Sequence, residues 1–317
     1  MTDLLRPAAR RVRAFFAPVE RATGTPAVFD PAHDACFALD APPAGWFDAG
    51  DLENFVRVPS TGIGAVRGGA TGAVAAQYRA LLEARVEFDF TRWGKLQMAI
   101  AGGSEHLNVL AAAENATPSP SGGTAAAAVA LDPASTATEL VIGAAAAQFA
   151  AGQMVAVDAD YAAQTGYLGT GIAGACVGDA SEIGAAPDYI RRVTFNVAKV
   201  ADVTATSLLL ETPLPGGVPA GAKAQKVIGF VDREGGRFFQ EWSGLFVVPE
   251  EAGGRICFHY PRLQCAAPAA EMEEKVGPLT ASSLHAMLRA LPLADPCDSA
   301  QAVCWRTYYP APDAPLY

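Results

Sequence analysis

The most informative part of the sequence lies between residues 45 and 99. It contains three segments: Gly45-Trp46-Phe47-Asp48-Ala49-Gly50-Asp51-Leu52-Glu53-Asn54-Phe55, then Arg67-Gly68-Gly69-Ala70, then Glu87-Phe88-Asp89-Phe90-Thr91-Arg92-Trp93-Gly94-Lys95-Leu96-Gln97-Met98-Ala99. None of them sets a nucleophile beside a base, spaces metal ligands or builds a phosphate-binding loop. Together they predict short β-strands, a long glycine-rich loop and a short helix.

Two strands are predicted on either side of that loop. Residues 52–58 and 86–90 have strand composition, and in the second the apolar and acidic side chains alternate between two faces. Residues 59–76 contain five glycines and predict a long loop that is mobile in an isolated subunit, which inside a compact domain is usually functional. Thr91 is expected to cap a helix that ends at Gly102-Gly103, and a further helical turn is expected to start at Ser104.

The composition favours a mainly β protein. A chain of 317 residues with 51% hydrophobic content can bury a large core, and its length suggests two compact units. Charged residues make up only 18%, while Gly and Pro number 31 and 23, which is typical of many short strands and turns.

A domain boundary is predicted by residues 114–137, whose prolines, glycines and alanines have linker composition. Further strands are expected at 139–142, 154–158, 193–203, 207–211 and 224–231, and then at 238–248, 256–261 and 302–309. The aromatic strands of the last group resemble partners for those before residue 113. We therefore expect one β-sandwich with a flanking short α-helix, built from 1–113 and 230–317, and an inserted small β domain at 138–229.

The charge and the distribution of apolar residues argue against several functions. A net charge of -10 and a sequence pI near 4.9 argue against a nucleic-acid reader, which needs clustered Lys and Arg. The basic cluster of Arg6, Arg10, Arg11 and Arg13 precedes an apolar run too short for a signal peptide, and no segment approaches the ~18 apolar residues of a membrane span. We expect a protein that stays in the cytoplasm or leaves it within a larger particle.

Motifs with catalytic or binding potential are weak. The spaced glycines of 169–174 match a dinucleotide-binding pattern, but Gly178, Gly184 and Pro187 interrupt the helix that should follow. Ser243 is not in the small-residue elbow that exposes a catalytic serine, although a triad with one of four histidines stays open. We expect no enzyme and no cofactor.

Metal binding is also disfavoured by the spacing. Cys257, His259 and Cys265 offer zinc-type ligands, yet strand alternation already places the first two on one face. Asp158 and Asp160 precede no calcium-binding loop. The six cysteines are too scattered for a disulfide framework and are expected to be small buried apolar groups.

The amino-acid sequence of several segments resembles that of the tail tube protein (major tail protein) of tailed phages and prophages. The resemblance covers residues 40–113 and 230–317. Besides the stretches quoted above, it rests on the run from Gln77-Tyr78-Arg79 to Phe90, on Phe239-Gln240-Glu241-Trp242-Ser243-Gly244-Leu245-Phe246-Val247 and on His259-Tyr260-Pro261-Arg262-Leu263. It implies a structural virion protein whose hexameric rings stack into a hollow tube for genome ejection. Residues 131–227 depart from the minimal family pattern, and we expect them to decorate the outside.

The resemblance also implies partners and contact residues. The long loop of each subunit would reach the next ring, and Arg67, Gly68, Gly69, Tyr78, Trp46 and Phe55 are the candidate contacts between rings or subunits. Other tail proteins (tape measure, terminator, distal tail or baseplate) would be partners, DNA would pass through the lumen without specific binding, and no membrane is involved. The expected location is the virion tail, with assembly in the host cytoplasm.

Two other classes of function stay open. A surface or secreted β-sandwich adhesin or carbohydrate-binding protein would use its aromatic side chains as a ligand groove, although an export signal is missing. A hydrolase would need a convergent set of His, Ser and Asp.

Overall fold

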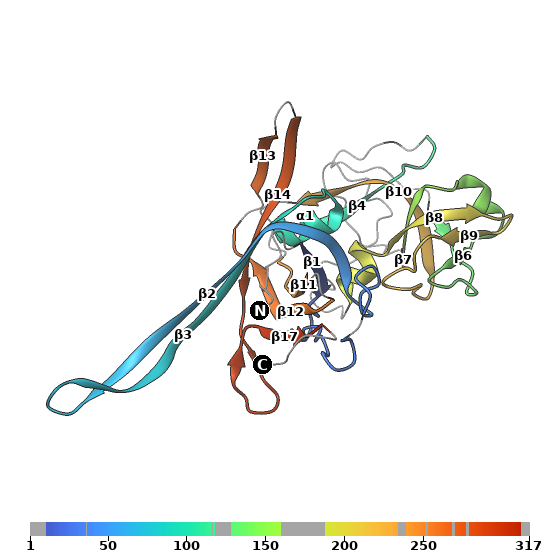
Figure 1. Ribbon diagram of the computed structural model, residues 1–317. Helices are drawn as coiled ribbons and strands as arrows, with labels where there is room; N and C mark the ends of the chain where they lie inside the picture. Colours follow the sequence, from blue (N-terminus) through green and yellow to red (C-terminus); the bar gives the residue numbers. More distant parts are fainter. Residues whose placement is uncertain are drawn as a thin grey trace. The chain divides into compact units, whose positions relative to one another are not determined.

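The computed structural model describes residues 11–35, 37–115, 117, 128–159, 188–233, 239–250, 253–267, 270–276 and 279–311. The fold is mainly β, as predicted, and these residues include one short α-helix (Figure 1). The chain forms two compact units: unit 1 comprises Met1–Val19, Pro26–Ser104 and Gly236–Tyr317, and unit 2 comprises Glu20–Thr25 and Glu105–Gly235. The second unit thus starts nearer the N-terminus than the expected insertion at 138–229.

Unit 1 is built on an eight-stranded antiparallel sheet in the order β13-β14-β3-β2-β1-β11-β12-β17. An additional pairing of β14 with β12 closes the path, so β14, β3, β2, β1, β11 and β12 form a barrel. The layers expected of a sandwich are here parts of one continuous sheet. The strands and helix of this unit are β1 (Val12–Pro18), β2 (Phe47–Gly68), β3 (Ala73–Phe90), α1 (Lys95–Gly102), β11 (Trp242–Pro249), β12 (Arg255–Cys265), β13 (Ala270–Val276), β14 (Leu279–Ala290), β15 (Leu293–Ala294), β16 (Gln301–Ala302) and β17 (Trp305–Tyr309).

Aromatic side chains fill the barrel. Phe16, Phe88 and Phe246 are fully buried, and their ring centroids lie 5.5 to 6.2 Å apart. The opposite face of β1 is also covered, because Phe15 packs in a cluster with Leu245 and the segment that precedes β2. A strand buried on both faces reads as a short continuous apolar run, which explains why alternation did not predict β1.

The segment 59–76 is not the long loop that we predicted. β2 runs to Gly68 and β3 starts at Ala73, so within this segment only the turn and the bulge residue Ala75 have no register partner. The outer part of this hairpin, from the Pro59–Ala84 pair to the turn, is called the arm below; Figure 1 shows it projecting from the barrel. The prediction was wrong because glycine was read as a loop signal, although Gly64 pairs with Tyr78 under its ring, where a Cβ atom would overlap the ring.

The helix was predicted at nearly the right place. α1 ends as expected at Gly102-Gly103. Gly103 is its C-cap, with a φ of 60°, and donates its N–H to the Ala99 carbonyl at 3.1 Å. Its N-cap, however, is Gly94 without a side-chain hydrogen bond, and the Thr91 hydroxyl instead donates to the Asp51 carbonyl at 3.4 Å. Gln97 fastens the helix to β2 by donating to the Ala49 carbonyl.

Unit 2 has a seven-stranded sheet with β4-β10-β7-β8-β9-β6 in order and β5 paired to β10. One core cluster includes Leu140, Val155 and Leu208, and a second includes Leu107 and Leu110. Its elements are β4 (Glu105–Leu110), β5 (Val129–Ala130), β6 (Glu139–Val141), the 3-10 helix η1 (Gly143–Gln148), β7 (Met154–Ala159), the π-helix η2 (Ile190–Thr194), β8 (Val197–Val203), β9 (Ser207–Leu210) and β10 (Ala222–Arg233).

Two local predictions in this unit were wrong. The expected helical turn from Ser104 is strand β4, which pairs with β10, and the strand expected from residue 193 begins only at Val197. The π-helix η2 takes up the first part of that range, and Asn196 anchors the bend that follows, because its fully buried amide donates to the carbonyls of Val157 and Gly217 at 2.7 and 2.9 Å.

Candidate interaction sites on the barrel and its arm

The first candidate site is the end of the arm, which holds four of the six contact residues proposed from the sequence. Arg67 lies just before the turn and donates to the Gly72 carbonyl at 3.1 Å. Gly68 ends β2, and Gly69 starts the turn with a φ of 73° that favours glycine. Within the described residues Arg67 makes no ion pair, so its charge is available to a partner.

The arm also exposes apolar side chains. Tyr78 is 56% exposed, and Ile63, Val66 and Val74 are exposed by 46 to 69%. Arg67 and Arg79 are the charged residues of its outer part, and Glu83 is an exposed acidic residue at its base. The arm therefore presents apolar and basic chemistry to its surroundings.

Trp46 and Phe55, the other two proposed contact residues, lie in the barrel and not on the arm. Trp46 is 8% exposed and belongs to the core cluster that covers the outer face of β1. Phe55 points inward, with its ring centroid 4.9 Å from that of Phe246. Trp46 is packed within the subunit, which leaves little of its side chain for a second copy, whereas Phe55 is half-buried and also lines a pocket.

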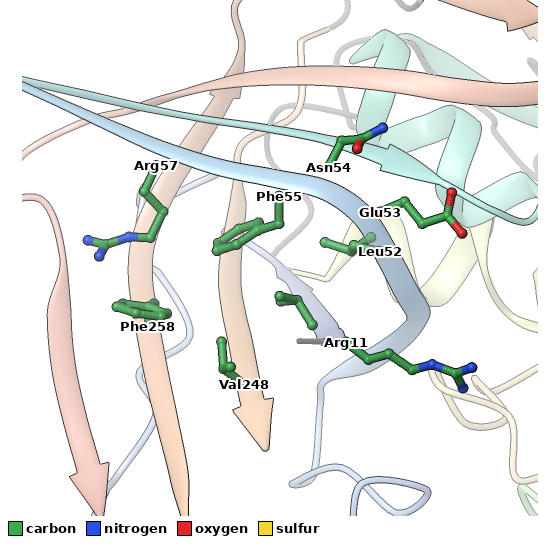
Figure 2. A pocket seen from close by; sticks show the side chains of 9 residues that line it. Arg11, Leu52, Glu53, Asn54, Phe55, Arg57, Val248 and Phe258 are labelled. Carbon is green, nitrogen blue, oxygen red and sulfur yellow. The ribbon is translucent and has the colours of Figure 1, made fainter. Parts of the chain in front are cut away.

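The second candidate site is a pocket of about 630 Å³ in the barrel, shown in Figure 2. Its lining consists of Arg11, Val12, Leu52, Glu53, Asn54, Phe55, Arg57, Val248 and Phe258. Arg57 extends from β2 over the ring of Phe258, 4.0 Å from the ring centroid, and donates Nε–H to the Tyr260 hydroxyl at 2.7 Å. This volume is in the range of pockets that bind ligands or peptide side chains.

Burial controls protonation next to this pocket. Burial raises the pKa of Tyr260 to about 12, with Cys304 adding to the rise and the Arg57 guanidinium opposing it. Burial likewise raises the pKa of the Cys304 thiol, against the influence of Arg57. At neutral pH both groups are therefore uncharged, and Arg57 is the cation of this group.

Sequence reasoning missed Arg57 and its partners. An available signal was the period of two in Phe55-Val56-Arg57, which places the arginine on the same face as an aromatic core residue. The strand register of Arg57 could not be extended from Leu52, because the bulge at Asn54 shifts the pairing of β2 with β3.

The zinc-type residues are separated by the structure. His259 is buried, its Nε2 lies 3.3 Å from the Ala27 carbonyl oxygen, and burial lowers its pKa to about 4. Cys257 is buried in the core cluster that contains Phe15 and Trp46. The thiol of Cys265 instead contacts the carbonyl oxygens of Ala101 and Ala267, near α1. The described part of the chain contains no group of three or more His, Cys, Asp or Glu side chains placed to hold a metal ion.

The remaining motif residues have structural partners or lie elsewhere. The Ser243 hydroxyl is buried and donates to the Pro261 carbonyl at 2.7 Å, and Asp158 pairs with Arg192 at 3.2 Å. The glycines of 169–174, Asp160, Cys36 and Cys176 fall outside the described residues. Among the helices that the structure describes, none has the length and apolar character needed to cross a membrane.

Comparison with known proteins assigns no family. No protein-family model matches the chain, and no curated protein matches it significantly.

Proposed function

We propose that the protein is a tail tube subunit of a phage or phage-like particle. Six copies form a ring, and rings stack into a hollow tube through which DNA passes to the host. The arm is the observation that carries the proposal, and the resemblance of residues 40–113 and 230–317 to tail tube proteins supports it.

The arm supports the proposal because its conformation calls for a partner. A two-stranded hairpin alone is at best marginally stable in water, and this one exposes Ile63, Val66, Val74 and Tyr78. A long exposed hairpin with apolar side chains is an aggregation hazard unless a defined contact covers it. In the proposed tube, the adjacent ring provides this contact.

The sheet edges support ring formation. β13 and β17 stand at the two ends of the sheet order, so each has an outer edge without a strand partner in the described residues. Unpaired edges invite pairing with further chains, and ring closure satisfies them in a controlled way. In this proposal the edges of neighbouring subunits join to build the wall of the tube.

The charge fits a conduit for DNA. A net charge of -10 repels phosphates, so the wall of the lumen passes DNA without holding it. Unit 2 decorates the outside, and other tail proteins bind the ends of the tube. The subunit assembles in the host cytoplasm and resides in the virion tail.

Shortening the arm tests the proposal. Thr61 and Leu82 are register partners, so residues 62–81 can be replaced by an Asn-Gly turn that joins them directly. The shortened variant should form single rings but no stacked tubes in negative-stain electron microscopy. The ring serves as the internal control for folding, and long tubes from this variant would contradict the role of the arm.

A further inference from the structure

A free strand edge lies at the base of the arm. β2 pairs with β1 only up to the Val12–Leu52 pair, whereas it pairs with β3 from Leu52 to Gly68. β1 covers one edge of β2 over residues 47–52. On the same edge, residues 53–57 have no partner strand among the described residues. Backbone N–H and C=O groups on such an edge are available to an added strand.

This edge is held in place from its other side. Asn54 has a φ of 51° and forms the bulge at which the register with β3 shifts. Its side-chain amide donates to Asp89 at 2.6 Å, and the other carboxylate oxygen of Asp89 lies 2.7 Å from Nδ1 of His285. The free edge is therefore preformed and does not have to be ordered by a partner.

The pocket in Figure 2 lies along the same edge. Glu53, Asn54, Phe55 and Arg57 of β2 line it, and the apolar side chains of Val248 and Phe258 form part of its wall. A strand added to the edge would direct alternate side chains to this pocket, since residues i and i+2 of a strand share a face.

The lining of the pocket carries more positive than negative charge. Arg57 bonds to the Tyr260 hydroxyl and, at 3.6 Å, to Sγ of Cys304, which are both uncharged at neutral pH. Within the described residues neither Arg57 nor Arg11 forms an ion pair, and Glu53 is the acidic residue of the lining. Two cations against one exposed carboxylate favour an acidic group in the occupant.

We propose that the pocket binds an extended segment of a partner protein, which adds a strand to β2 and places a Glu or Asp side chain on Arg57. An apolar side chain two residues away packs against Phe55 and Val248. A small carboxylate would satisfy Arg57 but leave the backbone edge unpaired, so the observations favour a polypeptide. This inference goes beyond the tube, because a single subunit provides the whole site.

Peptide binding tests the proposal directly. The probes are two fluorescein-labelled eight-residue peptides with central Val-Thr-Glu-Thr-Val or Val-Thr-Gln-Thr-Val and threonines at the ends, so that the valines share the face of the Glu or Gln, and they are titrated by fluorescence anisotropy. The full-length protein should bind the Glu peptide about tenfold more tightly than the Gln peptide, because a partly buried charged hydrogen bond is lost in the second. In the Arg57→Gln variant the two peptides should bind equally.

Controls separate the site from effects on folding. Arg57→Lys keeps the positive charge and should retain part of the preference for Glu. Arg85→Gln removes an arginine whose side chain is 54% exposed, pairs with Glu87 and is not in the pocket lining, so it should change neither affinity. The thermal unfolding midpoints of all variants establish that each is folded.

Several results would overturn the proposal. They are an equal affinity for both peptides, a preference that survives Arg57→Gln, or no binding of either peptide at about 1 mM. Binding seen only in a chain that lacks residues 1–10 would show that the site competes with a segment of the chain itself and not with a partner. Arg57-dependent binding of octanoate without binding of the peptides would assign the pocket to small anions instead.

Discussion

His259 shows how a single residue links the packing of unit 1 to pH. Its ring centroid lies 5.9 Å from that of Trp46 and 6.1 Å from that of Trp305, in a site that is almost closed to solvent. Burial lowers the pKa of His259 to about 4, and the hydrogen bond with Ala27 only partly opposes this. The folded state therefore favours the neutral ring, while the unfolded chain takes up a proton near the ordinary pKa of 6.5.

Acid should destabilise the protein through this residue. A lowered pKa in the folded state contributes stability above pH 6.5 that is lost as the pH falls toward 4. Between pH 7.5 and 4.5, the free energy of unfolding in urea should fall by about 2 to 3 kcal/mol more for the wild type than for His259→Gln. Equal losses in both proteins would contradict the argument.

His33 is the matched control for that measurement. It is exposed, and its hydrogen bond to Asp34 raises its pKa, so its stabilising contribution is present below pH 6.5 and lost as the pH rises through the raised pKa. His33→Gln should therefore leave the acid sensitivity of the wild type in place.

Among the elements, the arm is expected to be the least protected part of unit 1. Among the residues that the structure describes, its strands pair only with each other, whereas β1 has a paired strand on each side and is buried on both faces. In the isolated subunit, backbone amides of residues 63–79 should exchange hydrogen much faster than those of β1. Assembly should slow exchange in the arm more than tenfold, measured by mass spectrometry. Arm amides as slow as those of β1 before assembly would show that the arm needs no partner.

The sequence predicted elements where local pattern and tertiary packing agree. The alternation of Val86, Phe88 and Phe90 and the stop at Gly103 are both local signals, and both correspond to the structure. The arm was missed because glycines in a strand resemble a loop, and strands β13 and β14 were not predicted at all. Closure of the barrel through the β14–β12 pairing depends on contacts distant in sequence, which a local pattern does not contain.

The candidate sites divide in the same way. Arg67, Gly68, Gly69 and Tyr78 were found because they are local features of a glycine-rich segment. The pocket around Arg57 combines residues from β2, β11, β12 and the start of β1, and so required the fold. Trp46 and Phe55 were assigned to contacts between subunits because aromatic residues serve both interfaces and cores.

For the whole molecule, the two units predict separable roles. Unit 2 has its own sheet and core clusters, and its long segment enters after Ser104 and leaves before Gly236. Replacing residues 105–235 with a short Gly/Ser linker should leave rings and tubes intact if unit 2 decorates the outside. Loss of assembly, with unit 1 still folded by circular dichroism, would place unit 2 in the wall of the tube.

Electron microscopy of the full-length protein tests the central proposal most directly. Over a wide concentration range, and together with the proteins that initiate tail assembly, the proposal predicts rings with sixfold symmetry that stack into tubes with a central channel. Light scattering coupled to size exclusion should give a mass of six subunits, each of 32.8 kDa, for the unstacked ring. A protein that stays monomeric under all of these conditions would contradict the account.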